Sequence, residues 1–195
     1  MLLGRIKMKQ KIFVGDVLLL TVFLLLSFWG TKVISGAEAT ATYKNIALNK
    51  PYTMEPEGNY GLCTDPDDKI QLTDGQSFGS SWVRKTTVGW LCPLRTGIVI
   101  TIDLGAVEPI QGVSVASTAG AAGVTWPSAI FVLVSEDNQS WHYLGDLTVL
   151  RNTVYWVPPE TGLASYRYRT DQLKAHGRYV QFFMNADPYF FTYEI

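Results

Sequence analysis

Gly97-Ile98-Val99-Ile100-Thr101-Ile102-Asp103-Leu104 has the pattern of a β-strand. The isoleucines at 98, 100 and 102 alternate with other residues, and a period of two places all three on one face of an extended chain. This stretch is therefore predicted to be a strand with one face buried in a core.

Short runs rich in Val, Ile, Tyr and Phe recur along the chain and are separated by Gly, Pro, Asn and Asp. Further strands are expected at residues 112–117, 129–134, 141–150, 166–169, 178–184 and 190–195. A single helical turn is expected at 171–174. Many short strands separated by turn residues are typical of a sandwich, so we predict an all-β fold, a jelly-roll β-sandwich.

The first 39 residues have the pattern of a secretory signal peptide. Basic residues are concentrated in residues 1–11, and the apolar run at 17–29 is shorter than the roughly 20 residues that a membrane-spanning helix needs. Small residues follow and end in an Ala-x-Ala cleavage pattern at Ala39, with cleavage after Ala37 as the alternative. We predict a signal peptide at 1–39, a secreted or cell-surface protein, and one domain at 40–195. An uncleaved membrane anchor is the other interpretation.

The charge of the remaining chain argues against a nucleic-acid partner. Removal of residues 1–39 takes five of the 16 Lys and Arg residues and two of the 17 Asp and Glu residues, which leaves a net charge near −4. Phosphate binding needs clustered Lys and Arg, and no basic run remains.

The loop at residues 71–82 contains an Asp-Gly step, several hydroxyl residues and a tryptophan. A tight turn at Asp74-Gly75 can aim a carboxylate and several backbone carbonyls at one point, and Ca²⁺ prefers six to eight such oxygens. One short segment cannot supply them all, so a further carboxylate, Glu194, is expected to contribute. An ordinary turn between strands is the alternative.

Several segments, in this order, resemble the coagulation factor 5/8 type C, or discoidin, domain. They are residues 45–51, 72–75 with Trp82, 100–105, 110–113, 126–127, 134–141, 177–180 and 194–195. The resemblance implies the galactose-binding-like architecture, which is similar to the family 32 carbohydrate-binding modules of secreted glycosidases. It also implies a last strand that continues beyond Ile195, as in the N-terminal part of a longer protein.

The same resemblance implies a structural Ca²⁺ at the loop, closed by Glu194. The expected ligands are Leu72, Asp74, Gln76, Ser80, Ser81 and Glu194. The interval from Asp74 to Trp82 is one residue longer than is usual in the family. Gln76 stands where Asn or Asp is typical, so it is expected to offer only its backbone oxygen.

Candidates for a glycan site were chosen on chemistry, because the family's recognition loops diverge most here. Sugars present a C–H face to aromatic rings and hydroxyls to charged or amide groups. The loop residues of these types are Tyr60, Arg84, Lys85, Trp90, Tyr189 and Phe190. Trp90 could instead cover the edge of the core, and Tyr189 or Phe190 could pack beneath the calcium loop.

Cys63 and Cys92 are the only two cysteines. In an oxidising compartment such a pair normally forms a disulfide, which we predict here, with two free buried thiols as the alternative. Their spacing lacks the paired motif of a zinc site.

No catalytic motif is recognisable in the sequence, so an enzyme is not expected. The predicted function is a non-catalytic carbohydrate-binding module stabilised by calcium, of the kind that is appended to a glycoside hydrolase encoded downstream. The alternative is a discoidin-type adhesion module that binds a protein or a membrane surface. For that role the aromatic run at 189–191 would provide an exposed apolar loop tip.

Overall fold

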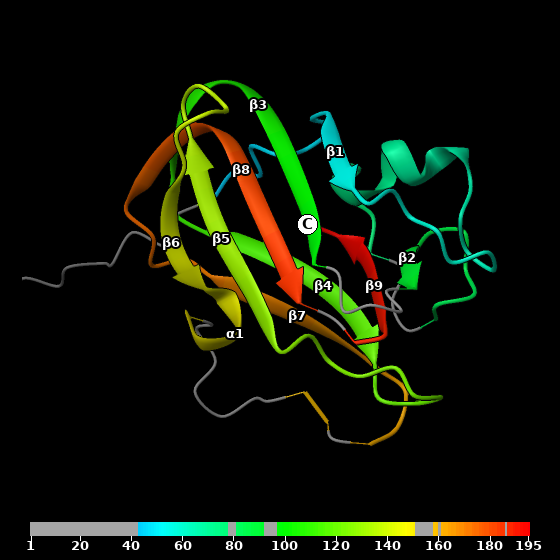
Figure 1. The fold of residues 1–195 in the computed structure, drawn as a ribbon. Helices are drawn as coiled ribbons and strands as arrows, with labels where there is room; N and C mark the ends of the chain where they lie inside the picture. The colour runs from blue at the N-terminus through cyan, green and yellow to red at the C-terminus, as the bar shows by residue number, and fades with distance from the viewer. Residues whose placement is uncertain (1–42, 78–80, 92–96, 151–157, 160, 186) are drawn as a thin grey trace, which may run out of the picture. The chain divides into compact units, whose positions relative to one another are not determined.

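The computed structural model describes residues 43–77, 81–91, 97–150, 158–159, 161–185 and 187–195. Two antiparallel sheets form layers (Figure 1). The five-stranded sheet has the order β1 (Tyr52–Glu55), β3 (Ile98–Ile110), β8 (Ala175–Asn185), β5 (Ala129–Ser135) and β6 (His142–Asp146). The four-stranded sheet has the order β2 (Val88–Leu91), β9 (Tyr189–Glu194), β4 (Val113–Ala119) and β7 (Ala164–Thr170). The predicted all-β sandwich is confirmed.

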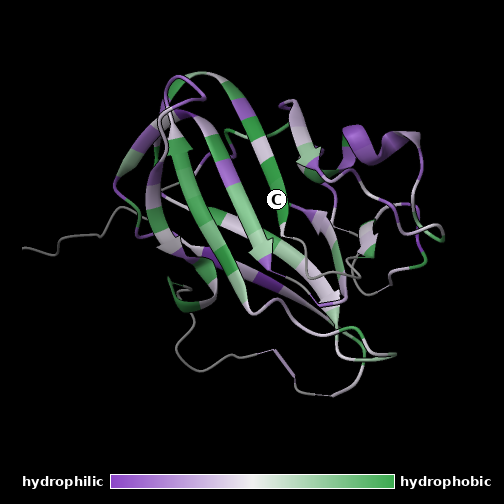
Figure 2. Ribbon diagram, in the orientation of Figure 1, coloured by the Kyte–Doolittle hydropathy of each residue, from purple (hydrophilic) through white to green (hydrophobic). Residues whose placement is uncertain are grey.

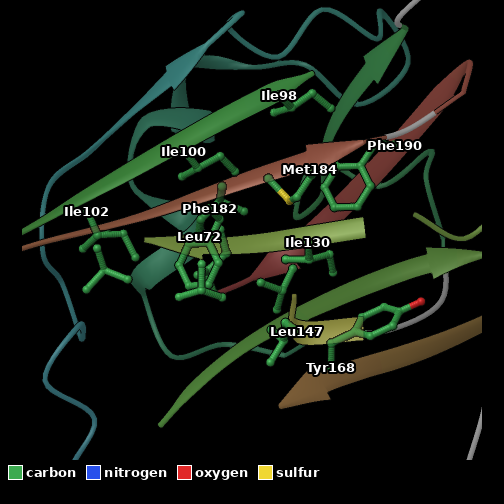
Figure 3. Close-up of a cluster of buried hydrophobic side chains, with 14 of the residues drawn as sticks. Leu72, Ile98, Ile100, Ile102, Ile130, Leu147, Tyr168, Phe182, Met184 and Phe190 are labelled. Atoms are coloured by element: carbon green, nitrogen blue, oxygen red, sulfur yellow. The ribbon is translucent and has the colours of Figure 1, made fainter. Parts of the chain in front are cut away.

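The core lies between the two sheets. Ile98, Ile100 and Ile102 of β3 are buried as predicted, and the register places Ile100 beside Phe182 of β8. Side chains from both sheets meet in one buried cluster, which Figure 3 shows together with Leu72 from the loop that follows β1. The alternation seen in the sequence therefore corresponds to one inward face.

Most expected strands are present with boundaries shifted by a few residues. The stretch 141–150 divides into β6 and a short helix, α1 (Leu147–Leu150), in which Leu147 is buried against the core. Residues 171–174 are irregular rather than helical, a correction to the expected helical turn. Strands β1 and β2 were not predicted, because each has only four residues and lacks a clear alternating run.

Residues 56–77 and 81–87 form an irregular segment between β1 and β2, which we call the loop layer. It contains two single-turn 3-10 helices, η1 (Pro66–Lys69) and η2 (Gln71–Thr73), and Figure 2 shows η1 as hydrophilic. The Tyr52 hydroxyl of β1 donates to the carbonyl of Asp68 and accepts from the Leu72 amide, so it joins the two turns to the sheet. The loop layer is thus fixed beside β9, with which η2 is in contact.

Within the described ranges, no helix is long and apolar enough to cross a membrane.

Candidate functional site

Asp74 and Glu194 come together where the loop layer meets the end of β9. The turn at Asp74 is tight: Gly75 has a φ of +78°, which favours glycine, and Asp74 Oδ1 accepts a hydrogen bond from the Gln76 amide at 2.7 Å. Glu194 is only 4% exposed, and its Oε2 has no hydrogen-bond partner. A buried carboxylate oxygen without a partner is costly unless something neutralises it.

The electrostatics of Glu194 fit a cation at this point. Burial, and to a smaller extent the nearby Asp74 carboxylate, raise the pKa of Glu194 to about 7. The Arg167 guanidinium and a backbone hydrogen bond at Gly75 act in the opposite direction. Because the Glu194 carboxylate is buried near that of Asp74 and one of its oxygens is unpaired, a bound cation would relieve both the repulsion and the desolvation.

The other predicted metal ligands have different surroundings in the structure. The Leu72 carbonyl accepts a hydrogen bond from the Ile195 amide at 2.8 Å, which ties η2 to the end of β9. The Ser81 carbonyl accepts from the Thr87 hydroxyl, and Gln76 is exposed. Ser80 lies outside the described residues. In the described part of the chain no group of three or more His, Cys, Asp or Glu side chains could hold a metal, so a Ca²⁺ here would need carbonyl oxygens besides the two carboxylates.

The arginine beside this pair is held by other partners. Arg167 of β7 donates to the Ser114 hydroxyl at 3.1 Å and to the Ser77 hydroxyl at 3.2 Å. Its guanidinium therefore bridges β4 and the segment that follows Asp74. It lowers the pKa of Glu194 through its charge, and no hydrogen bond between the two is seen.

Tyr60 and Tyr189, both predicted for the glycan site, lie together. Their ring centroids are 5.9 Å apart in an edge-to-face arrangement, and both rings pack around Phe191. Each tyrosine is half-buried, whereas Phe191 is buried beneath them. Two amphipathic rings supported by a buried third ring form a fixed, partly exposed aromatic surface.

Trp90 and Phe190 do not belong to that surface, which corrects two predicted site residues. Both are in the core between the sheets, with Trp90 fully buried and Phe190 1% exposed. They are cross-strand partners in β2 and β9, so they point to the same inner face. The Trp90 indole N–H donates to the Pro56 carbonyl at 2.8 Å, which satisfies its one polar atom.

Arg84 and Lys85 are exposed in the turn that precedes β2. The Lys85 ammonium donates to the Thr64 carbonyl at 2.7 Å, so it fastens two parts of the loop layer. The neighbouring Trp82 packs against Phe191, with ring centroids 5.7 Å apart. Lys85 therefore lies near the segment that carries Tyr60, because the Thr64 amide and hydroxyl donate to the Tyr60 carbonyl, and Arg84 precedes Lys85 in the same turn.

A pocket of about 250 Å³ lies in the loop between β4 and β5 and was missed by the sequence analysis. Its lining residues are Gly120, Ala121, Gly123, Val124, Thr125 and Trp126. Val124 packs in the same cluster as the tyrosine pair, and the Thr125 hydroxyl donates to the Asp187 carbonyl at 3.0 Å. The pocket thus adjoins the turn that carries Tyr189.

Trp126 forms part of the pocket wall. It is half-buried, and its indole N–H donates to the Pro159 carbonyl at 2.8 Å. The glycine-rich run Gly120-Ala121-Ala122-Gly123 was the sequence signal for this loop. In the structure three of these residues have positive φ angles. A Cβ at Gly120 would come within 2.2 Å of the Gly162 carbonyl, so glycine is required there.

Cys63 is buried, and burial raises the pKa of its thiol to about 12. Cys92 lies outside the described residues, so the predicted disulfide stays a prediction. The segment that carries Cys63 is hydrogen-bonded to β2 through Asn59, whose side chain accepts from the Leu91 amide at 2.7 Å. Leu91 immediately precedes Cys92 in the sequence.

The sequence matches no family model and no curated protein. Among solved structures, the chain is similar to a fucolectin from the serum of striped bass (Morone saxatilis), with a TM-score of 0.54 and 15% identity. That match covers 78% of this chain and 47% of the fucolectin chain. The fold is discoidin-like. The family resemblance seen in the sequence is thus confirmed at the level of the fold.

Two bacterial modules are also similar to the chain. Chitosan-binding module 1 of a chitosanase/glucanase from Paenibacillus sp. IK-5 has a TM-score of 0.49 and 17% identity, with 78% of this chain and 96% of the module covered. The module CpGH89CBM32-6 of Clostridium perfringens has a TM-score of 0.47 and 17% identity, with 77% and 95% covered.

Proposed function

We propose that this chain is a non-catalytic carbohydrate-binding module. The observation that carries the proposal is the half-buried pair Tyr60 and Tyr189 beside the open pocket at Trp126. Small-molecule sites combine apolar and aromatic walls with a few polar groups that fix orientation. A sugar would place its C–H face on the tyrosine rings and direct its hydroxyls to Thr125, Arg84 and backbone groups of the pocket loop.

The discoidin-like fold supports this function, because the fucolectin with the same fold is a lectin by name. The site is open, so each module buries little of its ligand. We expect a dissociation constant of about 0.1 to 1 mM, which corresponds to about 4 to 5.5 kcal/mol. Useful retention would then depend on linked modules or dense targets, as for an appendage to a glycoside hydrolase.

Calorimetric titration of the purified protein with galactose-type and other soluble sugars tests the proposal. Tyr189→Ala and Tyr60→Ala should each weaken binding at least fivefold, about 1 kcal/mol. Trp126→Phe should also weaken it, because the indole N–H that holds the pocket wall is lost. Val149→Ala, an exposed apolar truncation on α1, is the matched control and should bind as the wild type does. Binding that survives all three site substitutions would place the site elsewhere.

An adhesion module that binds a protein or a membrane was the other expectation. That expectation was based on an exposed apolar loop tip at residues 189–191, but Phe190 and Phe191 are each 1% exposed. No described feature now favours that function over glycan binding. Vesicles of anionic phospholipid are nevertheless a useful second arm of the titration, since binding to vesicles and to no sugar would favour adhesion.

We also propose a structural Ca²⁺ held by the Asp74 and Glu194 carboxylates with carbonyl oxygens of the loop. The unpaired Oε2 of Glu194 supports it. When bound, the ion would neutralise both carboxylates. The residues themselves position the loop: Leu72 holds the end of β9, and Asp74 closes the turn onto the Gln76 amide.

Secretion and a Cys63–Cys92 disulfide complete the proposal. N-terminal sequencing of exported protein should find a start within two residues of Thr40, and a product that keeps residues 17–29 would indicate an anchor. Peptide mapping without reductant should recover the two cysteines linked. Two alkylatable thiols in exported protein would contradict the disulfide.

A further inference from the structure

The outward face of the five-stranded sheet carries a strip of apolar side chains that the core does not use. It consists of Val99, Phe131, Leu133, Tyr143 and Phe183, which we call the sheet-face strip. Tyr143 is 60% exposed and Phe131 is 36% exposed, while the other three are half-buried. β5 is hydrophobic along its length (Figure 2), because it contributes both to the core and to this outer face.

The register makes the strip continuous across four strands. Phe131 of β5 lies beside Phe183 of β8, which lies beside Val99 of β3. Leu133 of β5 lies beside Tyr143 of β6. With neighbouring strands about 4.8 Å apart, the strip runs about 14 Å across the sheet. This length suits an extended chain rather than one small molecule.

The rings in the strip are held in place. Phe131 and Phe183 have centroids 6.0 Å apart with planes 13° from parallel, and Phe131 meets Tyr143 edge to face at 5.7 Å. Phe183 leans over Gly97, where a Cβ would come within 2.2 Å of its Cζ. The glycine therefore makes room for the ring, and the aromatic surface is organised before any ligand arrives.

Charge indicates which partner fits. The row through Phe131 ends in Asp146 on one side and Glu55 on the other. The parallel row continues from Leu133 to Gln181 and Thr101, which hydrogen-bond to each other. The strip is thus uncharged and has an acidic residue at each end.

A second copy of the chain fits this face poorly. If two copies stacked with their rows aligned, in either direction, carboxylates would face carboxylates. Anionic polymers and anionic lipid surfaces meet the same repulsion at both ends. A neutral chain with apolar faces and hydroxyl edges does not, and Gln181 and Thr101 lie beside the strip to receive hydroxyls.

We propose that the sheet-face strip is a second binding surface, separate from the loop-end pocket, for an extended uncharged polysaccharide. The residues that contact it are Phe131 and Tyr143, with Phe183 as the ring beneath. This goes beyond the proposed function and does not depend on it, because no residue is shared between the two surfaces.

Affinity electrophoresis of the purified protein in gels containing hydroxyethylcellulose or galactomannan tests the proposal, with polygalacturonate as the anionic polymer. The wild type should be retarded by a neutral polymer and less by polygalacturonate. Phe131→Ala with Tyr143→Ala should raise the dissociation constant for the neutral polymer about tenfold, which is about 1.4 kcal/mol. Val149→Ala should leave it unchanged. The double substitution should have the same effect in a Tyr189→Ala background, which separates this surface from the loop-end site.

Three results would overturn the proposal. One is no retardation by either neutral polymer, and another is retardation that the double substitution does not change. The third is a dimer in sedimentation that the double substitution converts to a monomer, which would make a second copy the occupant. A loss of sugar binding in Tyr189→Ala alone would bear only on the loop-end site.

Discussion

The interior between the two sheets and the loop layer both contain buried side chains, but different chemistry holds them. Between the sheets the buried side chains are aliphatic and aromatic, as around Phe182. In the loop layer they include Asp68, Gln71, Thr73 and Thr87. Apolar burial is non-directional, whereas each buried polar group needs its own partner. The core therefore sets the global stability, and the loop layer is the part that ions and protons can change.

The largest effect should come from the core. Phe182 lies between Ile100 and Val132 in the sheet register and is 1% exposed, so Phe182→Ala leaves a cavity. We expect the free energy of unfolding to fall by about 3 to 5 kcal/mol, measured by urea denaturation. Val149→Ala, which truncates an exposed residue, should change it by less than about 0.5 kcal/mol. A loss near 1 kcal/mol for Phe182→Ala would mean that the core is not the main source of stability.

Calcium should stabilise the folded protein where the loop layer meets the end of β9. If the ion binds only the folded state, Ca²⁺ at 100 times its dissociation constant adds about 2.7 kcal/mol to the free energy of unfolding. Chelator should reverse the gain, and Asp74→Asn should abolish it.

The calcium effect should also depend on pH with a defined sign. The pKa of Glu194, raised to about 7, means that protons compete with the cation, so the gain should shrink as pH falls through 7. Glu57→Gln, an exposed substitution in the same layer, is the control. Identical melting curves in Ca²⁺ and in chelator, with no metal by elemental analysis, would refute the site.

The difference between the two regions also explains what the sequence could predict. Alternation of Ile98, Ile100 and Ile102 determines which face is buried, because the side-chain period of a strand is two. The proximity of Asp74 and Glu194 was also predicted, because one tight turn cannot supply all the oxygens that Ca²⁺ prefers. Local chemistry was informative in both cases.

The glycan candidates show where local chemistry fails. Trp90 and Phe190 have the right residue types, but their pairing across β2 and β9 turns both rings inward. That pairing depends on a four-residue strand that has no clear alternation in the sequence. Tyr189, one position away, points to the other face of the same strand and stays partly exposed. The pocket at Trp126 depends on contacts with the Pro159 and Asp187 carbonyls, which no local pattern predicts.

The smallest of these effects concerns a single buried carboxyl inside the loop layer. Asp68 is 5% exposed; its Oδ1 accepts from the Gln71 amide at 2.8 Å, while its Oδ2 has no partner. Burial raises the pKa of Asp68 from 3.8 to about 6. The folded state therefore keeps this proton up to pH 6, whereas the unfolded state releases it near pH 4. The stabilisation that comes from protonated Asp68 is therefore fully present below about pH 4, and it is lost as the pH rises from about 4 to about 6.

Asp68→Asn removes that titration while keeping the acceptor for Gln71. Relative to the wild type, the variant should gain about 1 to 2 kcal/mol in free energy of unfolding at pH 8. This is less than the raised pKa of Asp68 alone would give, because the new amide N–H₂ also lacks a partner. The gain should vanish near pH 4, as followed by urea denaturation across this range in chelator. Taking the difference from the wild type cancels the titration of Glu194. Asp67→Asn, an exposed neighbour on the same turn, should show no such pH-dependent difference. If the free energies of unfolding of Asp68→Asn and the wild type differ by a constant amount from pH 4 to 8, burial does not change the titration of Asp68. The proposed electrostatic difference between the loop layer and the core would then be wrong.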